Sequence, residues 1–120
     1  IKEAAKKFIG TDAGMNTLLR PAFYDAYHQI LLASASRKGH EKVDVTGKIC
    51  ENSDRLATDR SLPPLEIGDI IAVKTVGAYG FCMSSQYNTR GQAAEVLISD
   101  GKARLIRKRQ GIEAFTRDLA

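Results

Sequence analysis

The order of apolar and polar residues along this chain predicts strands more often than helices. Residues 42–47, KVDVTG, alternate with a period of two, which is typical of a strand with one buried face. Residues 69–80, DIIAVKTVGAYG, are rich in β-branched side chains and predict a further strand. The clearest element lies at 94–107, where two alternating runs flank Asp100-Gly101, a dipeptide that favours a type I′ hairpin turn. These patterns favour a mainly β domain.

The remaining segments are shorter and less regular. Residues 6–14 predict a short strand followed by a loop, and Pro21 is well placed to begin a helical turn. Residues 28–34 form a short apolar run that fits either a strand or a helix. Residues 54–64 hold turn residues and two prolines, which predict a loop, and 111–119 predict a terminal helix. The sum favours an antiparallel β-barrel with short helical pieces.

Composition places the chain among ordinary globular proteins. Its 120 residues amount to one domain or part of one, with 43% hydrophobic and 27% charged residues. Part of the net charge of +4 comes from the basic run ARLIRKR at 103–109. That run could contact phosphate, but no aromatic residue is interleaved with it, so a solvated strand face is the preferred interpretation. We therefore expect no nucleic-acid partner.

Two further classes are not expected. No apolar run approaches the roughly 20 residues that cross a membrane, and the first residues lack the pattern of a signal peptide. The two cysteines, Cys50 and Cys82, form no C-x-x-C or Cys/His cluster, which argues against a disulfide framework and a metal site. A cytoplasmic protein without membrane contact fits these observations.

The stretch GKICENSD, residues 47–54, places a thiol beside an acid, Cys50 next to Glu51. A thiol in this setting can act as a proton donor or as a nucleophile. Repulsion between like charges favours the protonated thiol, so a donor is the better interpretation. Taken alone, the pair also fits an incidental cysteine in a turn.

Three other side chains could bind or catalyse. Tyr79 stands between small residues, where a ligand could approach the backbone and accept a hydrogen bond from the hydroxyl. Arg20 is suited to hold a carboxylate, because guanidinium and carboxylate form paired hydrogen bonds. His28 could be catalytic. Each also fits a structural role: a core tyrosine, a surface arginine and a packed histidine.

Three segments taken together resemble a known family. The segments DAGMNTLLRPAFYDAYH (12–28), GKICENSD (47–54) and VGAYGFCMSSQYNTR (76–90) occur in this order. They resemble the C-terminal part of the diaminopimelate decarboxylase family, and the likeness runs from about Phe8 to the end of the chain. This family belongs to the fold-type III pyridoxal-phosphate decarboxylases, which are similar to alanine racemase and eukaryotic ornithine decarboxylase.

The resemblance implies a two-domain enzyme that converts meso-2,6-diaminopimelate to L-lysine and CO2. Residues 1–120 would be its C-terminal β-domain, and a TIM-type barrel carrying pyridoxal 5′-phosphate would lie upstream. No lysine of this chain stands in a motif that matches the Schiff-base lysine of the family, so the isolated chain is expected to be inactive. Family members are homodimers with shared active sites.

The resemblance also assigns roles to five residues. Cys50 corresponds to the proton donor, and Glu51 corresponds to the acid that helps bind the distal amino-acid end of the substrate. Arg20 and Tyr24 correspond to the pair that binds substrate carboxylate. Tyr79 corresponds to a tyrosine that touches the substrate and the cofactor phosphate. In the family, the Cys50-Glu51 loop serves the partner's active site, while Tyr79 serves its own subunit.

Several positions depart from the family pattern. Lys48 stands where proline is common, Asn52-Ser53 replace a Ser-Gly or Ser-Ser pair, Gln86 replaces asparagine, and 89–96 lack prolines that often follow the Y-N-x-R motif. None of these is a residue with an assigned role. Two alternatives remain: a related decarboxylase acting on a carrier-linked glutamyl group, carboxynorspermidine or ornithine, and a non-catalytic basic β-barrel module that binds through 103–109.

Overall fold

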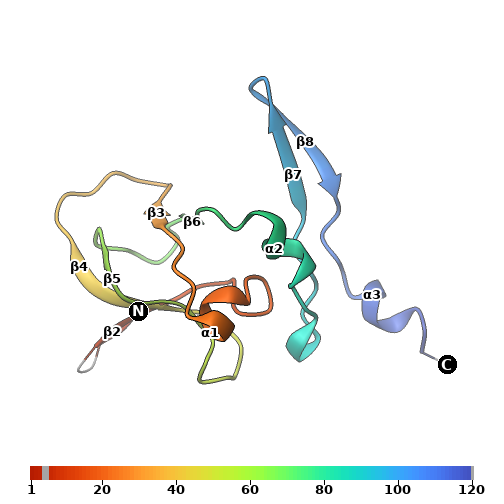
Figure 1. Ribbon diagram of the computed structural model, residues 1–120, viewed down its shortest axis with the longest axis horizontal. Helices are drawn as coiled ribbons and strands as arrows, with labels where there is room; N and C mark the ends of the chain where they lie inside the picture. The colour runs from red at the N-terminus through yellow and green to blue at the C-terminus, as the bar shows by residue number, and fades with distance from the viewer. Residues whose placement is uncertain (4–5, 120) are drawn as a thin grey trace.

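The computed structural model describes residues 1–3 and 6–119, which fold as short strands and helices (Figure 1). In chain order the elements are β1 (Lys2–Glu3), β2 (Lys7–Gly10), α1 (Arg20–Tyr24), β3 (Ile30–Leu32), β4 (Glu41–Thr46), β5 (Arg55–Leu62), β6 (Ile71–Val73), α2 (Gly77–Cys82), the 3-10 turn η1 (Tyr87–Thr89), β7 (Glu95–Ser99), β8 (Lys102–Arg107) and α3 (Glu113–Thr116). The prediction of a mainly β fold with short helical pieces is confirmed. The longest helix in the described ranges, α2, has six residues, far fewer than a membrane span requires.

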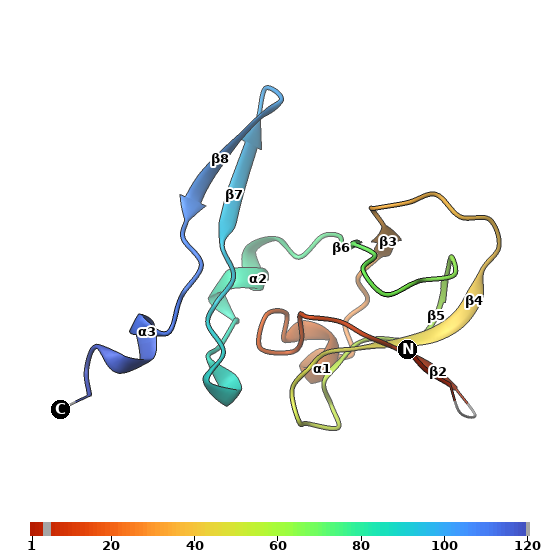
Figure 2. The same ribbon diagram turned by 180° about the vertical axis from the view of Figure 1, so that it is seen from behind.

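The described strands form three sheets. The largest has the order β1-β2-β4-β5, while β3 pairs with β6 and β7 pairs with β8. The pairing is antiparallel as expected, except that β2 runs parallel to β4. Figure 2 shows the β7–β8 hairpin standing away from the sheets that contain β4 and β6. The sheet β1-β2-β4-β5 therefore provides the frame from which the loops extend.

The apolar core lies over β4 and β5. Val45 is fully buried, and Val43 and Leu56 are almost completely buried beside it. Ile9 from β2 and Leu18 from the loop before α1 pack into the same cluster. Burial of apolar side chains is the main stabilising term of such a domain, so this cluster determines where the loops 11–19 and 47–54 leave the sheet.

The prediction of a loop at residues 54–64 is wrong, because most of this segment is strand β5. Leu56 and Leu62 supply buried side chains and β4 supplies hydrogen-bonding partners, which outweigh the turn residues between them. The turn residues are accommodated locally, since Asp59 takes a φ of 50° and its N–H donates to the buried carboxylate of Asp44 over 2.7 Å. The two prolines begin only after Leu62, where the strand has ended.

The single strand predicted for residues 69–80 is also wrong. Strand β6 ends at Val73, and α2 begins at Gly77. Thr75 and Gly77 both have positive φ values, 59° and 39°, which turn the chain out of the extended conformation. Tyr79 therefore lies in a helix and not at the end of a strand. The β-branched pattern indicated the strand but not the turn that ends it.

The hairpin predicted around Asp100-Gly101 is confirmed. Both residues have positive φ values, 50° and 70°, as a type I′ turn requires, and Ser99 pairs with Lys102 across it. The side chains of β8 are exposed, and Arg107 forms an ion pair with Glu95 on β7. Residues 103–107 of the basic run are therefore a solvated strand face within the hairpin, and Lys108 and Arg109 follow the end of the strand. The predicted terminal helix is confirmed as the single turn α3.

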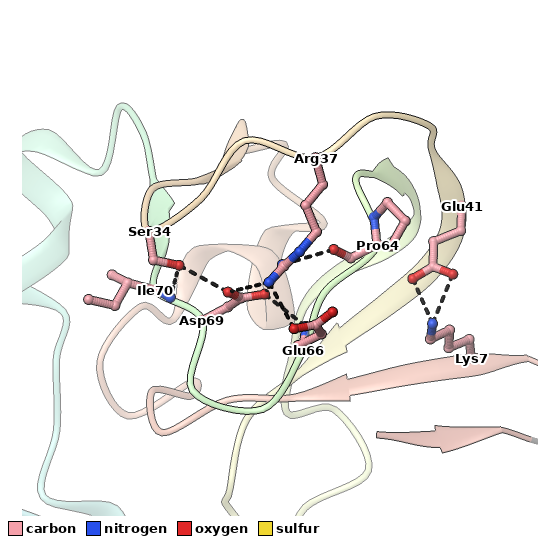
Figure 3. A network of polar contacts seen from close by, with 8 residues as sticks. All are labelled: Lys7, Ser34, Arg37, Glu41, Pro64, Glu66, Asp69 and Ile70. Atoms are coloured by element: carbon pink, nitrogen blue, oxygen red, sulfur yellow. Dashed lines mark hydrogen bonds and ion pairs between the residues drawn. The ribbon is translucent and has the colours of Figure 1, made fainter.

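A network of ion pairs and hydrogen bonds holds the loop between β5 and β6 against the segment between β3 and β4 (Figure 3). Arg37 forms ion pairs with Asp69 and Glu66, and it also donates to the carbonyl of Pro64. Asp69 in turn accepts from the backbone N–H of Glu66 over 2.7 Å and from the hydroxyl of Ser34 over 3.1 Å. The hydrogen bond from Arg37 is the main cause that lowers the pKa of Asp69 to about 2, with the N–H of Glu66 contributing next.

This network makes the stability of the protein depend on acid pH. Because the pKa of Asp69 is lower in the folded state than its ordinary value of 3.8, ionised Asp69 stabilises the fold above about pH 4. That contribution is lost as the pH falls through about 2. We expect the wild type to lose thermal stability more steeply between pH 4 and pH 2 than Asp69→Asn, as measured by circular dichroism melts. Parallel curves for the two proteins would contradict the assignment.

Candidate functional site

The carboxylate of Asp54 joins two loops that lie far apart in the sequence. Asp54 is 4% exposed; its Oδ1 accepts from the N–H of Met15 over 2.6 Å and its Oδ2 accepts from the N–H of Ile49 over 2.7 Å. Its own carbonyl accepts from the N–H of Gly47 over 3.0 Å. A buried carboxylate with these donors is fully engaged, and breaking the contacts would leave buried polar groups unsatisfied.

Two glycines make room for this carboxylate. A Cβ on Gly14 would lie 2.8 Å from Oδ2 of Asp54, and a Cβ on Gly47 would overlap the same carboxylate and lie 2.5 Å from Cα of Gly14. Distances this short cannot be accommodated without moving the backbone. The motifs around 12–28 and 47–54 therefore meet at a close contact that any side chain at these positions would disrupt.

The third motif joins the same junction. The carbonyl of Asn16, in the first motif, accepts from the N–H of Ser85, in the third, over 2.8 Å. The first two motifs also meet where the hydroxyl of Ser53 lies 3.9 Å from the sulfur of Met15. Asn88 reaches Cys50, with 3.0 Å between its Nδ2 and the thiol Sγ. The three segments that carry the family resemblance thus converge in space, around the loop 12–17.

Cys50 and Glu51 lie on the exposed tip of the loop 47–54. The Cys50 thiol is exposed and free of any disulfide. The carboxylate of Glu51 is turned back onto its own loop, where Oε1 accepts from the hydroxyl of Ser53 over 3.1 Å and from its N–H over 3.3 Å. The structure therefore presents the thiol outward and holds the acid beside it in a defined position.

Arg20 and Tyr79, predicted separately, lie together. The guanidinium carbon of Arg20 lies 5.1 Å from the centre of the Tyr79 ring, a cation–π contact between α1 and α2. The Tyr79 side chain is 54% exposed, and its hydroxyl makes no hydrogen bond to any described residue. This pair offers a positive charge and a free hydroxyl to an anionic group.

Tyr24 and His28 have different environments. Tyr24 is exposed one helical turn after Arg20, so both lie on one side of α1, and its ring packs edge-to-face on Phe23 with centroids 4.8 Å apart. His28 is 2% exposed, and its Nδ1 lies 3.1 Å from the carbonyl of Lys74. Burial of His28 agrees with a packed histidine, although its buried Nε2 has no hydrogen-bond partner among the described residues.

A polar cleft of about 320 Å³ opens beside the junction. Three cationic residues and one carboxylate are among those lining it, namely Lys48, Arg90, Arg109 and Asp12. Nε of Arg90 and the side-chain oxygen of the buried Asn16 have no hydrogen-bond partner. The excess of positive charge suits an anionic group near the thiol loop. Among the described residues no group of three or more metal-ligating side chains occurs.

Sequence reasoning missed two residues of this site. Asp54 has no assigned role in the sequence pattern, although an acid that follows Gly47 in a loop and precedes a strand fits a buried anchor as well as a turn. Asn88 gave no signal of its own, and only its place in the third motif pointed to it. Contacts between segments 38 residues apart cannot be derived from local patterns.

Comparisons with known proteins identify relatives of this chain. Residues 1–77 match the family described as "Pyridoxal-dependent decarboxylase, C-terminal sheet domain". The diaminopimelate decarboxylase of Methanothermobacter thermautotrophicus is 51% identical over 111 residues, which cover 92% of this chain and 26% of that protein. The corresponding enzyme of Archaeoglobus fulgidus is 49% identical over the same shares of both chains. The chain thus spans about a quarter of the length of these relatives.

Solved structures match most or all of this chain. A diaminopimelate decarboxylase from M. jannaschii in complex with L-lysine superposes with a TM-score of 0.93, at 38% identity, over 100% of this chain and 28% of that one. The Helicobacter pylori enzyme complexed with L-lysine gives a TM-score of 0.87, at 44% identity, over 96% of this chain and 28% of its own. A lysine/ornithine decarboxylase from Vibrio vulnificus, at 22% identity, shares the fold with a TM-score of 0.65.

The close contact between Gly47 and Asp54 gives a test of the junction. We expect Gly47→Ala to lower the free energy of unfolding by about 1–3 kcal/mol, because the added methyl forces the carboxylate and Gly14 apart. Urea denaturation measures the change. Gly10→Ala is the matched control, since a Cβ there meets nothing within 4 Å, and it should change stability by less than about 0.5 kcal/mol. Equal effects of the two substitutions would refute the contact.

Proposed function

We propose a function for this chain from the premise that it belongs to the pyridoxal-dependent decarboxylase family, by its C-terminal sheet domain. The chain is the sheet-domain part of a diaminopimelate decarboxylase, a cytoplasmic enzyme of lysine biosynthesis. The full-length protein converts meso-2,6-diaminopimelate to L-lysine and CO2 with pyridoxal 5′-phosphate. A cofactor-carrying barrel precedes residues 1–120 in that protein.

The observation that carries this proposal is the convergence of the three motifs. Their contacts bring a thiol, a guanidinium and a free tyrosine hydroxyl to the surface of one small domain. Two relatives that are about half identical to this chain over 111 residues are named for this activity. Two solved relatives hold L-lysine, the product that the proposed reaction would form.

Arg20, Tyr24 and Glu51 are the proposed substrate-binding residues. The substrate carries an ammonium and a carboxylate at each end. Arg20 and Tyr24, side by side on α1, suit a carboxylate, whereas Glu51 suits the distal ammonium. A substrate without the distal groups would leave these charges unmatched, which costs binding free energy. This pairing favours diaminopimelate over simpler amino acids such as ornithine.

Tyr79 fits the phosphate of the cofactor. Its exposed hydroxyl is free to donate, and the neighbouring guanidinium of Arg20 adds positive charge. Pyridoxal phosphate, when bound, supplies the electron sink that makes loss of CO2 from an amino acid feasible. The residues of this chain hold the phosphate and bind the substrate, and they do not attach the cofactor covalently.

Cys50 is the proposed catalytic proton donor. The carbon that loses CO2 must gain a proton, and the thiol provides it: the S–H bond breaks and a C–H bond forms. The thiolate that remains is protonated again from solvent. In the proposed homodimer the Cys50-Glu51 loop serves the partner's active site and Tyr79 serves its own. The Cys50–Asn88 pair joins the loop 47–54 to η1, and the Arg20–Tyr79 pair joins α1 to α2.

The full-length protein, supplied with pyridoxal phosphate, tests the donor role. We expect Cys50→Ala to lower kcat by at least about 100-fold, which is typical for loss of a general acid. Lysine formation and CO2 release measure turnover. Cys82→Ala is the matched control, because Cys82 is also exposed but lies in α2, and it should stay near the wild-type rate. Near-normal turnover of Cys50→Ala would remove Cys50 from the reaction.

A second pair of variants separates the two roles of Tyr79. Tyr79→Phe keeps the ring beside Arg20 but deletes the hydroxyl, so we expect weaker cofactor binding and little change in KM. Tyr79→Leu also removes the cation–π contact, which is worth about 0.5–1 kcal/mol at an exposed site, so KM should rise as well. Cofactor titration and steady-state kinetics on the full-length protein measure the two effects. Identical behaviour of both variants would argue against a separate contribution of the ring.

The substrate and the domain arrangement have their own tests. A panel of meso-diaminopimelate, ornithine and carboxynorspermidine distinguishes the proposed activity from a related decarboxylase. The coding sequence upstream of Ile1 should encode a barrel with a cofactor lysine, and an unrelated domain there would refute the proposal. Strongly salt-dependent binding of nucleic acid together with no turnover would favour the non-catalytic module instead.

A further inference from the structure

We propose that Asn88 is a positioning residue for the Cys50 thiol. Its side-chain amide donates to the sulfur, holds the thiol in one orientation and leaves the thiol proton free for transfer. The inference deepens the proposed function and rests on it for the meaning of that proton. The contact itself does not depend on the proposed function.

The contact joins two loops of this chain. Nδ2 of Asn88, in the turn η1, lies 3.0 Å from Sγ of Cys50. An amide nitrogen is only a donor, so the sulfur is the acceptor in this hydrogen bond. A thiol that accepts in this way has its own S–H proton still available. That is the state that a proton donor requires before it meets the substrate.

The second cysteine shows the opposite arrangement. Sγ of Cys82 donates to the carbonyl of Ala78, one turn earlier in α2, over 2.9 Å. Its proton is already engaged by the backbone. Both cysteines are exposed and free of disulfides, so exposure does not distinguish them. The two cysteines are distinguished by the direction of the hydrogen bond at sulfur, which Cys50 accepts and Cys82 donates.

The backbone around Asn88 is shaped for this contact. Asn88 has φ 58° and ψ 32°, and Thr89 has φ 54°, so two successive residues adopt the left-handed conformation. Most residues avoid this conformation, and asparagine tolerates it best after glycine. Strain of this kind persists only where the surroundings hold it, and it is concentrated at functional sites.

The surroundings do hold this segment. Gln92 Nε2 donates to the hydroxyl of Ser84 over 2.6 Å, and the side chains of Gln92 and Gln110 are joined by a hydrogen bond of 3.0 Å. Gln86 donates to Gln110 over 2.9 Å. These amide contacts fix both sides of η1, so the Asn88 side chain is presented from a braced loop.

The cysteine side of the contact is braced as well. Ile49, next to Cys50, is buried and donates its N–H to the Asp54 carboxylate. The sulfur and the amide therefore approach each other from two fixed backbones. After the thiol proton has passed to the substrate carbon, the same N–H donates to the thiolate, and a hydrogen bond to a charged group is stronger than one to a neutral group. Asn88 thus stabilises the state that follows proton transfer.

A first experiment measures the contact without using activity. In the full-length protein, Asn88→Asp keeps the shape of the side chain but places a carboxylate against the sulfur. Alkylation requires the thiolate, so we expect iodoacetamide to modify Cys50 about fivefold more slowly. Peptide mass spectrometry measures Cys50 and Cys82 in the same sample, and Cys82 should not change. Thr89→Asp places the same charge one residue further on and should slow Cys50 much less.

A second experiment measures the consequence for turnover of meso-diaminopimelate. Asn88→Gly keeps the left-handed backbone and deletes the amide, and we expect kcat to fall about tenfold. KM should stay within about twofold, because the contact acts after binding. The solvent deuterium isotope effect on kcat should rise, since proton delivery becomes slower. Thr89→Gly relaxes the neighbouring left-handed residue in the same way and should leave all three quantities close to wild type.

Each outcome decides one part of the proposal. Equal rates of Cys50 alkylation in Asn88→Asp and Thr89→Asp would overturn the contact, regardless of the turnover that either protein shows. A confirmed contact, with equal turnover and isotope effects in Asn88→Gly and Thr89→Gly, would overturn the positioning role. A wild-type protein that binds pyridoxal phosphate but does not turn over meso-diaminopimelate would overturn the proposed function and that role together, and the alkylation result would still stand.

Discussion

The buried carboxylate of Asp54 is the constraint on which the candidate site depends. It accepts hydrogen bonds from the backbone N–H groups of Met15 and Ile49, which lie in two different loops. It also occupies space that a Cβ on Gly14 or Gly47 would take. An anion with this little exposure is tolerated because its oxygens accept hydrogen bonds from fixed donors. The loop that carries Cys50 therefore has its shape determined by an acid four residues away, which takes no part in the proposed chemistry.

The sequence predicts most of this fold where a pattern is local. The alternation at 42–47 and the Asp100-Gly101 turn each specify an element by themselves, and the structure confirms both elements. The single buried face expected at 42–47 is wrong, because Asp44 is buried between Val43 and Val45. The prediction fails for β5, whose turn residues are overridden by pairing with β4. It also fails for α2, whose start depends on positive φ values at Thr75 and Gly77. Both failures arise from tertiary contacts or backbone conformations that a hydrophobic pattern does not encode.

The candidate site could be predicted only in part, for the same reason. Residue type was sufficient to select Cys50 and Arg20 as chemically capable, and the family resemblance assigned their roles. Residue type does not reveal that Arg20 packs on the Tyr79 ring or that Cys50 accepts from Asn88. Cys50 and Cys82 illustrate the point, because two exposed thiols in one chain have opposite hydrogen-bond roles. Their difference comes from the backbone around them.

The positions that depart from the family pattern also acquire a physical explanation. Proline often follows the Y-N-x-R motif in the family, where it would restrict the backbone covalently by fixing φ. This chain has Gln92 in that region and Gln86 shortly before η1, and both form hydrogen bonds to Gln110. The carbonyl of Gln110 also closely approaches Gly91, where no side chain would fit. Side-chain amides thus brace the loop that presents Asn88. The donor loop and the loop that orients it are both held by polar contacts to backbone or amide groups. The apolar core adds to these contacts through Leu18, which precedes α1, and through Val76, which precedes α2.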